Sequence, residues 1–92
     1  MENRRRHKTP SKVEGSLLLA KRRRLLGTEG DPATERIQFI FEWSPDLARD
    51  LEELREDRAV VNVRDFARAW HEICALIWAA RRERGDQTGA RR

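Results

Sequence analysis

The side chains that could support acid–base or metal chemistry are few and widely separated in this chain. His7 lies in a basic segment near the N-terminus, and His71 is followed directly by Glu72 in a helical pattern. Adjacent residues on a helix point in different directions, so His71 and Glu72 do not by themselves form a general-base pair. Cys74 is the only cysteine, which excludes an internal disulfide and a cysteine zinc site. Because the sequence also lacks a glycine-rich phosphate loop, we expect no enzyme activity, no cofactor, and no catalytic or metal-binding residues.

Positive charge is concentrated in two clusters near the N-terminus, separated by twelve residues. The clusters are Arg4, Arg5, Arg6 and Lys8, and then Lys21, Arg22, Arg23 and Arg24. Their spacing resembles a bipartite nuclear-localisation signal, in which acidic grooves of an import receptor bind the two clusters. The resemblance implies a nuclear protein, with shuttling to the cytoplasm left open. Basic clusters are also common on solvated surfaces, which is the alternative interpretation.

The second cluster continues into two leucines, in the segment AKRRRLLG. This segment resembles the cyclin-docking motif of Kip-type inhibitors of cyclin-dependent kinases, of pocket proteins and of many kinase substrates. The resemblance assigns Arg23 to the basic position, Leu25 to the buried leucine and Leu26 to the neighbouring hydrophobic position. It implies a cyclin–kinase complex as a partner, with the segment extended in an apolar groove. The rival interpretation is an amphipathic basic helix over residues 16–26, with Ser16 as N-cap, that packs on the rest of the chain.

Thr9 is followed by Pro10 and, two residues further on, by Lys12. This order matches the preference of the same kinases for Ser or Thr, then Pro, then a basic residue, so we expect phosphorylation of Thr9. The resemblance to a docked kinase substrate covers only Thr9 to Gly27 and identifies no family for the rest of the chain.

The charge of the chain changes sign twice along its 92 residues. Residues 1–30 contain nine Lys and Arg against three Asp and Glu, residues 31–58 four against nine, and residues 59–92 seven against four. Arg outnumbers Lys by 17 to three and forms bidentate contacts with phosphates. The alternative function is therefore that of an Arg-rich nucleic-acid-binding accessory protein, of the compact kind that viruses often encode.

No apolar run reaches the roughly 20 residues that cross a bilayer, and the N-terminus lacks the apolar segment of a secretory signal. We therefore expect no membrane partner. We expect three parts: a flexible basic arm over 1–30, a small α-rich interaction domain over 31–85, and a disordered tail over 86–92.

Two helices are expected in the interaction domain. Ser44, Pro45 and Asp46 form a favourable N-cap and first turn for a helix over residues 45–58. Asn62 is the candidate N-cap of a longer helix over residues 63–84, in which apolar residues recur with helical periodicity.

One or two short strands complete the expected domain. Residues 36–43 alternate between apolar and polar side chains and are rich in aromatic residues, which predicts a strand. Asp31 and Pro32 are also a favourable helix start, so a helix here stays open. Residues 59–63 either pair with this strand or connect the two helices.

The predicted fold class is therefore mainly α: a small helical domain with two principal helices, up to two short strands, and a disordered or partly helical N-terminal arm. The apolar face of the 63–84 helix exceeds what one short strand and one thin helix can cover. We expect part of this face to contact another protein or a second copy of the chain. The expected interface residues are Phe66, Trp70, Ile73 and Ile77.

Overall fold

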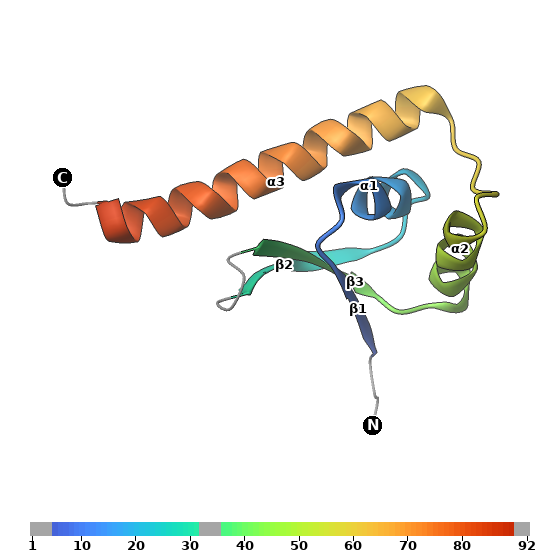
Figure 1. Cartoon of the computed structure of the whole chain (residues 1–92), viewed down its shortest axis with the longest axis horizontal. Helices are drawn as coiled ribbons and strands as arrows, with labels where there is room; N and C mark the ends of the chain where they lie inside the picture. The colour runs from blue at the N-terminus through green and yellow to red at the C-terminus, as the bar shows by residue number, and fades with distance from the viewer. Residues whose placement is uncertain (1–4, 32–35, 90–92) are drawn as a thin grey trace.

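The computed structural model of the chain describes residues 5–31 and 36–89. These residues form three strands and three helices in the order β1 (Arg6–Thr9), α1 (Lys12–Ala20), β2 (Leu25–Asp31), β3 (Arg36–Glu42), α2 (Pro45–Arg55) and α3 (Val63–Gly89) (Figure 1). Arg4, the possible helix start at Pro32, and residues 90–92 of the expected tail lie outside the described residues.

The three strands form one antiparallel sheet in the order β1-β3-β2. The predicted strand over residues 36–43 is confirmed as β3, and it occupies the central position because it alone alternates strongly apolar side chains. Phe41 is opposite His7 of β1 and Leu25 of β2, and Phe39 is opposite Thr9 of β1. Cross-strand partners share a face of the sheet, so these side chains all point to the same side.

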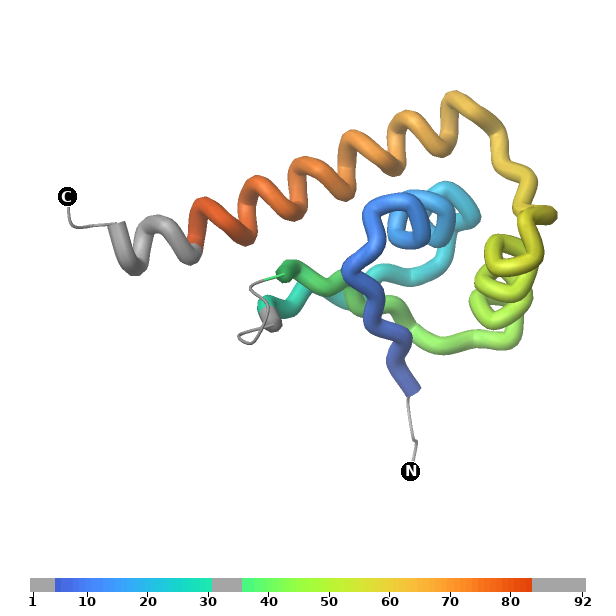
Figure 2. The backbone as a smooth tube through the Cα atoms, in the orientation of Figure 1, coloured from blue at the N-terminus to red at the C-terminus, as the bar shows by residue number. Residues whose placement is uncertain are grey.

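The core lies on the Phe39 side of the sheet, under α1 and α3, whose paths over the strands can be followed in Figure 1 and Figure 2. Its fully or almost fully buried members come from four elements and are Leu18, Ile37, Phe39, Phe41, Leu47 and Ile73. The opposite face of the sheet holds one buried apolar residue, Ile40, which is paired with Lys8. On this face the Lys8 ammonium lies 3.3 Å from the Glu29 carboxylate. This ion pair joins β1 to β2 across the central strand.

Helix α1 begins four residues earlier than the helix expected over 16–26, and its N-cap is Ser11, whose hydroxyl accepts from the Glu14 amide at 3.1 Å. Gly15 lies inside the helix, where an added Cβ would be 3.2 Å from Ile73 and 3.4 Å from Phe39. Gly15 therefore allows α1 to approach the core closely. Ser16, the expected N-cap, is instead fully buried, and its hydroxyl has no hydrogen-bond partner among residues 5–31 and 36–89.

The start of α2 is as predicted, since the Ser44 hydroxyl accepts from the Leu47 amide at 3.1 Å. Helix α3 is longer than predicted, because its backbone continues past the expected stop at Gly85 to Gly89. Asn62 Oδ1 accepts from the amides of Arg64 at 2.9 Å and Asp65 at 3.1 Å, which confirms its role at the start of this helix. Residues 59–62 form a connection, not a strand.

Helices α1 and α2 end in the same way. After α1, the amide of Arg22 donates to Leu19 and the amide of Arg23 to Leu18, which together form a Schellman motif. Arg22 has a φ of 66°, and Asp57, at the equivalent position after α2, has a φ of 63°. Glycine is the usual residue at this left-handed position, where other residues cost about 1–2 kcal/mol and Asp is better tolerated than Arg.

The prediction of a mainly α fold is wrong: the domain combines three helices with a three-stranded antiparallel sheet and is mixed α and β. The expected disordered or partly helical arm is wrong for the described residues from Arg5 onwards, which contribute β1, α1 and β2. The basic sequence of β1 (RHKT) and the glycine-containing sequence of β2 (LLGTEGD) both lack an apolar alternation of their own. They form strands because β3 supplies hydrogen-bond partners and an apolar surface. This contribution comes from tertiary structure, so the local strand propensity of the sequence does not reveal it.

Candidate functional site

The two basic clusters of the predicted import signal are part of the folded domain. Arg5, Arg6 and Lys8 lie on or beside the edge strand β1, with their side chains exposed. Lys21 and Arg22 form the turn after α1, and the intervening residues are folded as the end of β1 and as α1. The spacer between the clusters is therefore ordered and not a flexible linker.

Two of the residues that carry the resemblance to a cyclin-docking motif, Arg23 and Leu25, already have partners inside the domain. The Arg23 guanidinium donates from Nε to Asp50 Oδ2 at 2.5 Å and from Nη2 to Asp50 Oδ1 at 3.4 Å. Asp50 is buried on α2, and its hydrogen bond raises the pKa of the Arg23 guanidinium. Leu25 pairs with Phe41 and packs against the core, whereas Leu26 is partly exposed. A cyclin groove that bound both Arg23 and Leu25 would have to displace Asp50 from Arg23 and separate Leu25 from the sheet.

Thr9 is buried on the core side of β1, and its hydroxyl accepts from the Ser11 amide at 3.1 Å. A kinase would reach this hydroxyl only after β1 had separated from β3. Beside it, His7 Nε2 lies 2.6 Å from Glu14 Oε2, which ties the same strand to the first turn of α1.

The four residues of the predicted partner face have different environments on α3. Ile73 is completely buried, and Ile77 packs partly buried against the core. Phe66 and Trp70 are half-buried and stack with ring centroids 6.2 Å apart. Ile73 and Ile77 are thus engaged inside the domain, and only part of Phe66 and Trp70 remains accessible.

A neighbouring strip of α3 is more exposed than the predicted face. Its apolar residues recur every three or four positions and therefore lie along one side of the helix. We call this strip the α3 stripe and define it as Val63, Ala67, Trp70, Cys74 and Trp78. Val63 is 82% exposed and Trp78 is 62% exposed.

The sequence pattern contained a signal for the α3 stripe. Trp78 comes five residues after Ile73, which places it about 140° around the helix from the buried isoleucine. The core-facing stripe of an amphipathic helix is about 100° wide, so a residue 140° from the buried Ile73 is expected outside the core.

Positive charge borders the α3 stripe on both sides. On one border the charges are those of Arg64 and Arg82, which are both exposed; the exposed His71 lies on the same line along the helix, seven residues after Arg64 and eleven before Arg82. The Arg82 guanidinium lies 4.7 Å from the centre of the Trp78 ring. On the other border, the Lys12 ammonium of α1 lies 5.7 Å from the centre of the Trp70 ring.

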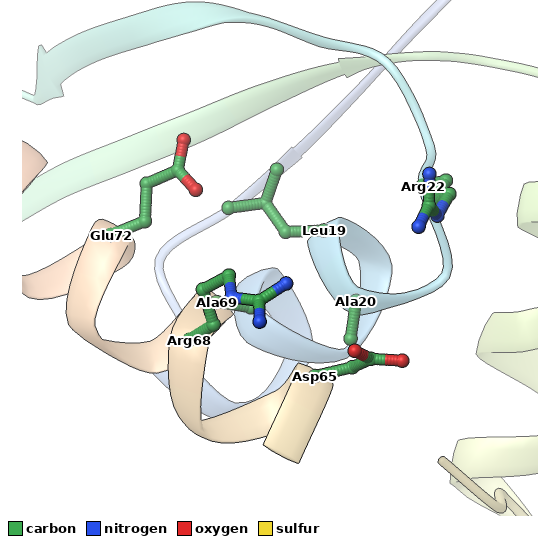
Figure 3. Close-up of a pocket in the computed structure, with 7 residues that line it drawn as sticks. All are labelled: Leu19, Ala20, Arg22, Asp65, Arg68, Ala69 and Glu72. Carbon is green, nitrogen blue, oxygen red and sulfur yellow. The ribbon is translucent and has the colours of Figure 1, made fainter. Parts of the chain in front are cut away.

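Negative charge on α3 lies elsewhere on the helix. Asp65, Glu72 and Glu83 also follow one another at seven and eleven residues, on a line about 100° further from the stripe than the basic line. Asp65 and Glu72 face α1 (Figure 3). Among the side chains of α3 that the structure describes, the charged ones next to the stripe are therefore basic.

No group of three or more His, Cys, Asp or Glu side chains is placed to hold a metal ion within the described ranges. Within the same ranges no helix is long and apolar enough to span a bilayer. No protein-family model matches the chain, and comparisons with curated proteins and with solved structures also give no match.

Proposed function

We propose that this protein is a non-catalytic adaptor that binds an acidic, amphipathic helix of another protein along the α3 stripe. The observation that carries the proposal is the continuation of the apolar surface of α3 beyond the core into solvent, where Trp78 remains 62% exposed. An exposed Trp flanked by Arg is a typical centre of a protein interface.

The shape and charge of the stripe define the partner. An apolar strip along a straight helix fits the apolar side of a second helix, with anchors three and four residues apart. Arg64 and Arg82 would then pair with carboxylates on the flanks of the partner. Such charge complementarity speeds the encounter and excludes basic helices.

A second copy of this chain is a poor occupant of the stripe. Antiparallel pairing of two α3 helices would bring Arg64 of one copy towards the Arg82 end of the other. Like charges would then face each other on both borders of the interface, which opposes association.

Single-stranded nucleic acid fits less well than an acidic helix. Proteins of that kind stack successive bases on several free aromatic rings. Trp70 is already covered by Lys12 and stacked on Phe66, so Trp78 is the one indole of the α3 stripe with most of its surface free. Val63 and Ala67 add apolar surface that a phosphate backbone would not use.

Titration with synthetic helical peptides tests the adaptor proposal. One peptide carries leucines at helical spacing with glutamates around them, and the second carries lysines in place of the glutamates. We expect saturable binding of the acidic peptide only, and Trp78→Ala should weaken it about 30-fold by removing a central aromatic anchor. Fluorescence anisotropy of labelled peptides measures both affinities.

Trp43→Ala is the matched control for this titration. Trp43 is also partly exposed but lies after β3, under Arg5, and not on α3. It should leave peptide binding unchanged. Equal affinity for both peptides, or tighter binding of a single-stranded oligonucleotide that weakens steeply with salt, would contradict the adaptor proposal.

We also propose that the protein is nuclear and that the basic residues around the turn after α1 contribute to import. Replacing Lys21, Arg22 and Arg24 by Ala removes three positive charges, two of them on exposed residues, and keeps the Arg23–Asp50 ion pair. In a tagged fusion too large to enter the nucleus by diffusion, we expect this variant to become cytoplasmic by microscopy.

The control for import removes three other exposed arginines, Arg49, Arg55 and Arg58, on or just after α2. This variant loses the same charge and should remain nuclear. Nuclear accumulation of both variants would refute a role for the turn.

A further inference from the structure

A hollow of about 280 Å³ lies between the C-terminal end of α1 and the first half of α3. Figure 3 shows its seven lining residues, which are Leu19, Ala20, Arg22, Asp65, Arg68, Ala69 and Glu72. It lies on the acidic side of α3, away from the α3 stripe, so the inference below is independent of the adaptor proposal.

The hollow combines apolar side chains with charges of both signs. Leu19, Ala20 and Ala69 supply the apolar surface. On α3 the charges alternate, because Asp65, Arg68 and Glu72 come at intervals of three and four residues. Arg22 adds a second guanidinium from the turn after α1, and in Figure 3 it lies at the opposite end of the group from Glu72.

These four charged side chains are not matched with one another. Within the described residues, none of them has an ion pair within 4.0 Å or a side-chain hydrogen bond, although Arg68 is within helical reach of both carboxylates. Elsewhere in the domain, pairs such as Arg23–Asp50 and Lys8–Glu29 form readily. The donors and acceptors around the hollow are therefore available to a ligand.

The backbone at Arg22 is an independent observation. Its φ of 66° is the left-handed conformation that glycine adopts most easily, and the Schellman motif needs no side chain there. Unlike Asp57, Arg22 cannot use a short side chain to relieve this conformation locally. A strained residue whose side chain lines a hollow points to a role for that side chain.

We propose that the hollow binds a small zwitterion such as a free amino acid. Its carboxylate would lie between Arg22 and Arg68, its ammonium would contact Asp65 or Glu72, and its side chain would pack on Leu19. A purely anionic or purely cationic ligand would meet two groups of its own sign. The volume lies near the lower limit of about 300 Å³ for ligand pockets, which favours a small molecule.

Amide chemical shifts of the ¹⁵N-labelled protein provide the test. The probes are L-alanine and L-leucine, with acetate and methylammonium as the separate halves of the zwitterion. We expect saturable shifts at Ala20, Arg22 and Ala69 with the amino acids in the millimolar range, and weak, unsaturated shifts with acetate or methylammonium alone. Shifts of equal size with acetate, or no saturation with either amino acid, would overturn the proposal.

Arg22→Gly and Asp57→Gly form a matched pair of variants. Both variants place glycine at a left-handed position after a helix, where it is less strained than the native residue, so both should raise the melting temperature. Only Arg22→Gly should weaken amino-acid binding, by about tenfold or more, because it removes a charge-assisted hydrogen bond. Because both variants stay folded, wild-type affinity in Arg22→Gly would refute the site, and equal weakening in both would show that Arg22 has no specific role.

Discussion

Replacement of Arg23 by alanine is expected to lower the free energy of unfolding by about 3–5 kcal/mol, because it leaves a buried carboxylate without its cation. The Asp50 side chain is only 5% exposed and receives its short hydrogen bond from this guanidinium. A domain of this size has about 5–14 kcal/mol of stability in total. Urea unfolding followed by circular dichroism would measure the loss.

Arg24→Ala is the control for this experiment. Arg24 is the next residue, but its side chain is 73% exposed and lies 3.7 Å from Glu42 at the surface. Exposed pairs contribute about 0–1 kcal/mol, so this variant should stay close to wild type. If both variants were equally stable, the Arg23–Asp50 pair would not hold α2 to the turn after α1.

The Arg23 result also bears on cyclin docking. If the ion pair contributes as expected, a cyclin would have to break it before binding Arg23. Folded protein should then bind a cyclin–kinase complex much more weakly than a peptide spanning residues 18–27. For this reason the adaptor proposal rests on α3.

Truncation of Ile73 to alanine should cost about 2–5 kcal/mol, because it leaves a cavity in the core. Ile73 is 0% exposed. It packs beside Gly15 of α1, where an added Cβ would lie 3.2 Å from the Ile73 side chain. Trp78→Ala, five residues later on the same helix, should change stability by no more than about 0.5 kcal/mol, because its ring is largely in solvent. Thermal unfolding of the two variants, measured side by side, separates the core side of α3 from its binding side.

The opposite ranking would be decisive. A stable Ile73→Ala protein together with an unfolded Trp78→Ala protein would mean that α3 is rotated relative to the sheet. The α3 stripe would then belong to the core.

The sequence was sufficient for the elements that carry their own local signals. Residues 36–42 alternate apolar side chains, Ser44 and Asn62 cap helices, and α3 repeats its apolar residues over many turns. Each of these signals lies within one element. They identified β3, α2 and α3 without knowledge of the tertiary structure.

The first third of the chain could not be predicted in this way. β1 and β2 become strands only through pairing with β3, and Gly15 and Ser16 are tolerated inside α1 only because the helix packs tightly on the core. A short motif such as Arg23 with Leu25 gives no indication that Arg23 forms an ion pair with Asp50 or that Leu25 pairs with Phe41 in the sheet. The charges around the hollow come from two segments more than 40 residues apart, so no local pattern brings them together.

The pairing of β1 with β3 also sets an order of events during synthesis. Residues 6–9 can pair only after residues 39–42 have been synthesised, and Arg23 can form its ion pair only after Asp50 has been synthesised. Contacts between such distant positions form late, because a long loop has to close first. While the chain is still emerging from the ribosome, both basic clusters are therefore unpaired and accessible, and any factor that reads them as linear peptides has its best access to them at that stage.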